Sequence, residues 1–248
     1  MPSTSVDITV ILACRDRGRF LHPAVRSVAD AVERAESELG ISIEWLTVAA
    51  PSSEATEQYL SNHLPSRSRR VRFAGTDLAA AKNQAVAEAR GRYIAMTGGD
   101  DLVSSNWLSK SYELCMAEPR AVVFHPHAVI VFGDTRLLYV TPDQEDPDLS
   151  PDAIFARNLW PATSVGQAKI YRDHKFVDAD QERGFGYSDW HWVCETVASG
   201  VVHRPVPRTL SCCRQQDTHT CVPVPGRLTD LLPRSRFFQR SPAGARVT

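Results

Sequence analysis

Two consecutive segments near the start of the chain constrain its fold most strongly. Residues 8–13 form a short run rich in apolar and β-branched side chains, which is typical of a strand covered on both faces. The next segment carries apolar side chains at steps of three and four, as in an amphipathic helix: Leu21, Val25, Val28, Val32, Ala35 and Leu39. Pro23 suits the first turn of that helix and Gly40 its end. With a second strand expected at residues 41–48, this order predicts a parallel α/β sheet.

The alternation of strands and helices continues to a loop with two acids. We expect the following elements: a helix at 54–60, a strand at 71–73, a helix at 77–90, a strand at 92–97, a helix from Ser104 or Ser105 towards Cys115, extended segments at 121–132 and 137–140, and a helix at 188–198. The strand at 92–97 runs into Gly98-Gly99-Asp100-Asp101. Because ligands of open α/β sheets bind beyond the carboxyl ends of the strands, this loop is a candidate site.

Length, composition and charge limit the class of protein. A chain of 248 residues with 43% hydrophobic residues can form one substantial core, so we expect a single domain over residues 1–225 and a basic tail over 226–248. A net charge of -1 argues against a nucleic-acid partner. No apolar run reaches the roughly 20 residues needed to cross a bilayer, and no signal sequence is visible at the start, so a cytoplasmic location is expected. The six cysteines show no C-x-x-C spacing, so reduced thiols without zinc are expected.

Four parts of the chain carry a recognisable order of motifs: residues 8–28 (ITVILACRDRGRFLHPAVRSV), 47–60 (TVAAPSSEATEQYL), 79–85 with 89–95, and 186–190 (GYSDW). Together these segments resemble the inverting family 2 glycosyltransferases with the GT-A fold. The resemblance covers about residues 8–214. It implies a Rossmann-like, mostly parallel sheet flanked by helices, with an acceptor-side subregion. It also implies transfer of a sugar, a hexosyl or deoxyhexosyl group, with inversion, from a nucleotide-activated donor to a glycan, lipid-linked or small-molecule acceptor.

The chain departs from this family's pattern at three positions. Ala49-Ala50-Pro51-Ser52 stands where the family usually has D-D-G-S, so an acid that contacts the nucleotide is absent. Gly98 and Gly99 stand where the family's D-A-D-D loop begins, and Ser188 replaces a glutamate. An alternative is therefore a catalytically silent module that binds a sugar nucleotide or a glycan. A nucleotidyltransferase is a weaker alternative because a Gly-rich basic phosphate loop is missing.

The resemblance assigns roles to the surviving acids. Asp100 matches the metal-holding position of a DXD-like loop, where Mg²⁺ or Mn²⁺ would neutralise the departing diphosphate, and Asp101 would contact the metal, its waters or the sugar. Asp189 matches the catalytic base, and its place in the first turn of a helix favours the ionised form. His219 is a candidate to complete the metal site. Each residue also has a structural interpretation, as a turn, a helix start or an exposed side chain.

Other charged residues are candidates for the donor and for a membrane. Lys82 stands where the family often has arginine, to meet the donor phosphate or base, although a solvated helix lysine is an equal alternative. Asp16, with Arg17, follows the first strand where the nucleotide pocket begins, although a charged loop there needs no functional role. Trp160 and Trp190 are candidates to stack on sugar rings, with packing as the alternative. The arginines of the tail suggest peripheral contact with an anionic membrane, against the alternative of a simple terminus.

Overall fold

The structure is a computed structural model that describes residues 5–50, 52–133, 136–150, 152–177, 185–215 and 232–239. The helices are α1 (Leu21–Leu39), α2 (Glu54–Asn62), α3 (Leu78–Glu88), α4 (Trp107–Ala117), α5 (Ala153–Ala156), α6 (Ala168–Asp173) and α7 (Ser188–Ala198). The strands are β1 (Ile8–Cys14), β2 (Ile43–Ala49), β3 (Ser68–Val71), β4 (Tyr93–Gly98), β5 (Leu102–Val103), β6 (Val122–Gly133), β7 (Leu137–Val140), β8 (Ser164–Gln167) and β9 (Val202–Gln215). Short 3-10 turns lie at Gly18–Phe20 and Arg236–Gln239.

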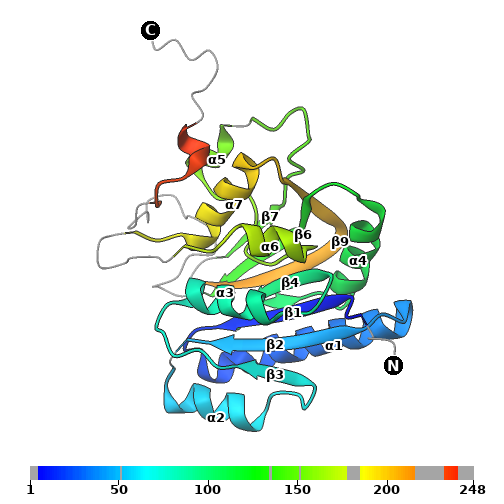
Figure 1. The fold of residues 1–248 in the computed structure, drawn as a ribbon, viewed down its shortest axis with the longest axis vertical. Coiled ribbons are helices and arrows are strands. Elements are labelled where there is room, and N and C mark those ends of the chain that lie inside the picture. Colours follow the sequence, from blue (N-terminus) through cyan, green and yellow to red (C-terminus); the bar gives the residue numbers. More distant parts are fainter. Residues whose placement is uncertain are drawn as a thin grey trace.

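The strands form one mixed sheet (Figure 1). Its order is β3-β2-β1-β4-β8-β6-β9-β5, with β7 paired to β6. The first four strands in this order are parallel, which confirms the expected β-α-β-α-β unit. Strand β8 then runs antiparallel between β4 and β6, so the second half of the sheet is no longer a simple parallel array.

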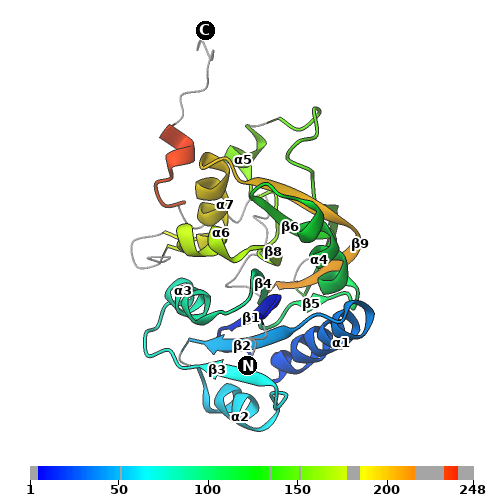
Figure 2. The same cartoon turned by 45° about the vertical axis from the view of Figure 1, so that its right-hand side comes forward.

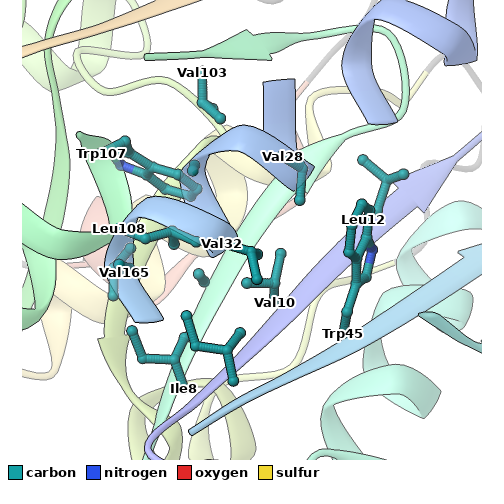
Figure 3. Packing of buried hydrophobic residues seen from close by; sticks show 14 of the residues in the cluster. Ile8, Val10, Leu12, Val28, Val32, Trp45, Val103, Trp107, Leu108 and Val165 are labelled. Carbon is teal, nitrogen blue, oxygen red and sulfur yellow. The ribbon is translucent and has the colours of Figure 1, made fainter. Parts of the chain in front are cut away.

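Helices cover both faces of the sheet (Figure 2). Along β1, Ile8, Val10 and Leu12 pack on the side of α1 and α4, whereas Ile11 and Ala13 pack on the side of α3, α6 and α7. Both faces of β1 are therefore buried, which explains its continuous apolar sequence. Figure 3 shows the first of these layers, where Val28 and Val32 of α1 lie with Val10 and Trp107.

Helix α1 matches the expected one at both ends. Gly40 caps it with φ 63° and ψ 25°, and its N–H donates to the carbonyl of Glu36. A residue with a Cβ in this left-handed conformation costs about 1–2 kcal/mol. The local sequence pattern was sufficient here because both the apolar stripe and the stop signal act within the helix itself.

We expect Gly40→Ala to lower the free energy of unfolding by about 1 kcal/mol, because alanine strains the left-handed cap. Urea unfolding of the full chain measures this change. Glu33→Ala, at an exposed position of the same helix, is the matched control and should change stability by less than about 0.5 kcal/mol. An equal effect of the two substitutions would contradict the role of the cap.

Some expected elements were displaced. Strand β3 occupies Ser68–Val71 rather than 71–73, and α4 begins at Trp107 with Asn106 before it, so neither Ser104 nor Ser105 caps it. The Ser104 hydroxyl instead donates to Asn106 Oδ1. The sequence pattern does not predict β8, α5, α6 or the full length of β9, because these segments are short or have no regular apolar periodicity.

The end of the described chain lies against α5 and α7. Arg236 donates from Nε to Glu195 Oε2 at 2.6 Å, and the rings of Phe237 and Phe238 lie 5.0 and 5.3 Å from that of Phe155. Among the described helices, none has the length and apolar character needed to cross a membrane.

The cysteines only partly follow the expectation of reduced thiols. Cys14, Cys115, Cys194 and Cys212 are free. Cys213 is disulfide-bonded, which corrects the expectation for that residue.

Candidate active site

The candidate site lies where β1, β2 and β4 end. These strands are parallel and in register, with Ala13 opposite both Val48 and Gly98. The loops that follow them therefore leave the sheet at the same edge. Asp100 and Asp101, predicted from the loop after β4, are indeed there and are almost fully buried.

Two glycines make room for the acids in this loop. A Cβ on Gly98 would lie 2.7 Å from Asp101 Oδ2, and a Cβ on Gly99 would lie 2.6 Å from Cys14 Sγ. Both distances are far below ordinary contact, so side chains at these positions would displace the acid or the end of β1. Gly98 replaces the family's first acid at a place where the carboxylate of Asp101 fills the space.

Asp100 forms an ion pair with Arg17. Arg17 Nε lies 2.7 Å from Asp100 Oδ2, and the two side chains are 12% and 11% exposed. The contact is an ion pair and not an aligned hydrogen bond, because this buried Nε has no hydrogen-bond partner. Arg17 follows β1, so the pair joins the loops after β1 and β4.

Asp101 is held in an environment that favours its protonated form. Burial raises the pKa of its carboxyl to about 7, and the nearby charges of Asp100 and Asp189 act in the same direction. The backbone N–H of Arg214, in β9, donates to Asp101 Oδ1 at 3.2 Å and opposes the rise. The carboxyl of Asp101 therefore keeps its proton to a higher pH than an ordinary aspartate does.

Arg214 was not singled out as a site residue from the sequence. Its guanidinium carbon lies 4.4 Å from the ring centroids of both Phe20 and Phe132. These cation–π contacts hold the charge beside the loops that carry Arg17 and Asp101. The three residues come from distant parts of the chain, so no local sequence signal identifies the arrangement.

Lys82 and Asp189 lie together. Lys82 Nζ, in α3, lies 2.6 Å from Asp189 Oδ1, in the first turn of α7, and 4.9 Å from the ring centroid of Phe176. The lysine side chain is 7% exposed and the aspartate 35%, so the carboxylate keeps an open side. Lys82 thus lies against the carboxylate of Asp189, the predicted general base. There it orients the carboxylate and compensates its charge.

The turn before α7 is strained. Tyr187, the residue before the helix, has φ 58° and ψ 44°, a left-handed conformation that costs a residue with a Cβ about 1–2 kcal/mol. Such strain concentrates at functional sites, where it sets the direction of a neighbouring side chain. Here it precedes Asp189 by two residues.

Asp16 points away from the acidic loop. Its carboxylate accepts hydrogen bonds from the hydroxyls of Ser53 and Thr56, at the start of α2, with a Ser53 distance of 2.6 Å. These bonds lower the pKa of Asp16, with the Ser53 hydroxyl as the largest cause. Asp16 therefore ties the loop after β1 to α2, whereas its neighbour Arg17 faces Asp100.

A pocket of about 570 Å³ opens at the ends of β2 and β3. Its lining residues are Ala49, Ala50, Glu57, Arg70, Val71, Arg72 and Phe73. Arg70 forms an ion pair with Glu57 at 2.6 Å. Ala49 and Ala50, which occupy the positions of the family's D-D pair, line this pocket. Two arginines, Arg70 and Arg72, also line it.

Three candidates from the sequence remain: His219, Trp160 and Trp190. His219 lies outside the described residues. Trp160 and Trp190 are 3% and 6% exposed and donate from Nε1 to the carbonyls of Pro142 and Ile154, so both pack in the interior.

The described donors do not fit a divalent metal. In the part of the chain that the structure describes, no three side chains of His, Cys, Asp or Glu converge on a common point. One carboxylate oxygen of Asp100, Oδ2, already faces the buried guanidinium of Arg17. Binding of Mg²⁺ or Mn²⁺ through this oxygen would require the ion pair to open.

Comparison with known proteins decides the family. The sequence matches the model of glycosyl transferase family 2 over residues 9–176. The chain belongs to this family. No curated protein sequence matches it significantly.

Solved structures of TarS from S. aureus share the fold. TarS 1-349 superposes with a TM-score of 0.59 at 12% identity, over 84% of this chain and 60% of that one. The complex of the same fragment with UDP-GlcNAc gives a TM-score of 0.62 at 11% identity, over 87% and 60%. A longer TarS structure gives 0.57 at 14% identity, over 85% and 37%. The fold is therefore the GT-A-like α/β fold, and the chain spans less than two thirds of these relatives.

Proposed function

We propose that this family 2 member is a glycosyltransferase that moves a hexosyl or deoxyhexosyl group, with inversion, from a nucleoside diphosphate sugar to an acceptor hydroxyl. The observation that carries the proposal is the placement of Asp189. Its half-open carboxylate, paired with Lys82, lies close enough to the buried Asp101 to affect the pKa of that residue. Such a transfer needs a general base near the acceptor and charged groups near the departing diphosphate. We assign the first role to Asp189 and the second to the loop after β4.

The proposed reaction uses residues of this chain alone. Asp189 accepts the proton of the acceptor hydroxyl while the hydroxyl oxygen attacks the anomeric carbon. The bond between that carbon and the β-phosphate oxygen breaks, and its electron pair leaves with the nucleoside diphosphate. Because attack and departure occur on opposite faces of the sugar, the configuration inverts. No step is routed through a metal, since the described donors do not fit one.

We place the nucleoside in the pocket at Ala49 and Ala50. The pocket lies beyond β2 and β3, and Arg72 lines it beside the Arg70–Glu57 ion pair. The guanidinium of Arg72 and the ring of Phe73 suit a base with a neighbouring phosphate. UDP-sugars are the first donors to test, because TarS has been solved with UDP and with UDP-GlcNAc. The acceptor is proposed as a glycan, a lipid-linked molecule or a small molecule, and contact of the basic tail with an anionic membrane stays a prediction.

Thermal shift tests the proposed function. UDP-, GDP- and dTDP-sugars are added to the full chain, because a ligand that binds only the folded state raises its melting temperature. We expect at least one donor to raise it, and sugar release from that donor to follow when acceptors are supplied. Stabilisation without any transfer would favour the silent binding module, and no stabilisation by any donor would contradict both functions.

The Ala50 position gives a prediction about nucleotide preference. Ala50 offers no carboxylate to the base or ribose, so we expect the native chain to discriminate weakly among nucleotides. Ala50→Asp should sharpen that preference about tenfold, the effect of one hydrogen bond to a charged group. Competition binding with UDP, GDP and dTDP measures it, and Ala50→Asn is the uncharged control. A native chain that already rejects all but one base would show that another contact reads the nucleotide.

A further inference from the structure

The guanidinium of Arg17 lies beside the carboxylate of Asp100, which the sequence predicts to be a metal ligand. Arg17 Nε lies 2.7 Å from Asp100 Oδ2, and both side chains are largely buried. Burying a single charge is costly unless an opposite charge lies beside it. The fold therefore keeps a guanidinium at the strand-end loop, paired with the carboxylate of Asp100, before any donor arrives.

The guanidinium of Arg17 has donors left for a ligand. Nε is buried against Asp100 Oδ2, but Nη1 makes only a 3.5 Å bond to the carbonyl of Asp16. Nη2 has no partner among the described residues. A buried guanidinium whose N–H groups are underused is suited to phosphate oxygens, which it binds through two parallel hydrogen bonds.

The loops around this charge are held from a second direction. Phe20, three residues after Arg17, packs against the guanidinium of Arg214, whose backbone N–H binds Asp101. The loop that carries Arg17 is thus fixed against β9 as well as against Asp100. This arrangement reduces the reorganisation that a bound diphosphate would require.

We propose that Arg17, and not a divalent metal, neutralises the diphosphate that departs during sugar transfer. The inference rests on the proposed function and deepens it. As the bond between the anomeric carbon and the β-phosphate oxygen breaks, the guanidinium stabilises the negative charge that develops on the leaving group. Asp100 then acts as a positioning residue that holds Arg17 at the end of β1.

Binding of UDP to the full chain tests this inference, with calorimetry in excess chelator and in excess Mn²⁺. We expect the two dissociation constants to agree within about threefold. Arg17→Ala should weaken UDP binding in chelator by roughly tenfold or more, since it removes charge-assisted hydrogen bonds to phosphate. Arg17→Lys should retain part of the affinity, because it keeps the charge and loses the fork. Arg26→Ala, which removes an exposed arginine of α1, is the matched control and should bind as the native chain does.

The outcomes separate this inference from the proposed function. UDP binding that needs Mn²⁺, by tenfold or more in the native chain, overturns the inference and leaves the glycosyltransferase in place. Native affinity in Arg17→Ala also overturns it. Absence of UDP, GDP and dTDP binding under both conditions overturns both. The metal comparison uses the native chain alone, so it decides even where Arg17→Ala folds poorly.

Discussion

Asp189→Asn is expected to lower the rate of sugar transfer by roughly 10²-fold or more, the usual effect of losing a general base. The amide keeps the shape of the side chain and still accepts a hydrogen bond from Lys82 Nζ, which lies 2.6 Å from Oδ1 of Asp189 in the native chain. It does not take the proton of the acceptor hydroxyl. Donor affinity should change little, because the proposed donor pocket lies at β2 and β3.

Initial rates under saturating donor measure the effect, together with UDP affinity and melting temperature. Asp173→Asn is a matched control, since Asp173 also pairs with a lysine, Lys169, but on an exposed surface of α6. It should leave the rate unchanged. A rate in Asp189→Asn within about threefold of the native rate would remove Asp189 from the role of base.

The parts of the fold that follow from local pattern were predictable. The apolar run of β1, the stripe of α1 and the first turn of α7 each carry their signal in consecutive residues. The acidic loop was located for the same reason, since Asp100 and Asp101 directly follow β4. Periodicity and a strand end are short-range properties, so one sequence is enough to identify them.

The pairing of charges was not predictable in this way. Lys82 and Asp189 are 107 residues apart, and each has an ordinary surface interpretation when taken alone. The direction of Arg17 and Asp16 depends on how the loop after β1 turns, and the two neighbours face different partners. A pattern can place an acid at a sheet edge, but only the packed loops determine which cation reaches it.

The same limit applies to the second half of the sheet. Strand β8 has four residues and enters between β4 and β6 with antiparallel pairing to both. Its segment, Ser164–Gln167, has no alternation that distinguishes it from a loop. Its position follows from the edge that β4 leaves open, which is a tertiary property.

A buried pair of histidines beside this strand carries the second large expected effect, on stability. His125 Nδ1 lies 3.0 and 3.1 Å from the carbonyls of Pro161 and Thr163, so it carries the hydrogen. His125 Nε2 then accepts from His203 Nδ1 at 2.9 Å, and the hydroxyl of Thr196 lies 2.9 Å from His203 Nε2. All four ring nitrogens are satisfied with both histidines neutral when the Thr196 hydroxyl donates to His203 Nε2 rather than to the carbonyls of Trp192 and Val193, which lie 2.9 and 2.8 Å away.

Protonation of this pair is opposed by its surroundings. Burial lowers the pKa of His125 to about 4 and that of His203 well below its usual value, with the charge of His125 adding to the second shift. Unfolded histidines take up protons near pH 6.5. Between pH 6.5 and about 4 the unfolded state therefore binds more protons, and stability falls as the pH falls. Above pH 6.5 the pair adds no pH dependence.

Asp101 affects stability in the opposite direction over the whole of this pH range, so its contribution must be removed from the measurement. Its raised pKa of about 7 makes the folded state bind the proton first, and this contribution to stability increases as the pH falls from 7. In Asp101→Asn, we expect the free energy of unfolding to fall by about 1.5 kcal/mol from His125 alone between pH 6.5 and 5, since the unfolded histidine is half protonated at pH 6.5 and becomes almost fully protonated at pH 5. His203 adds a fall of the same sign. Adding His203→Gln, whose amide can both donate to His125 and accept from Thr196, should reduce the slope, because one of the two histidines that resist protonation is removed. Urea unfolding at stepped pH measures both, with His63→Gln as the exposed control, and an unchanged slope in the His203→Gln variant would show that the pair is not its source.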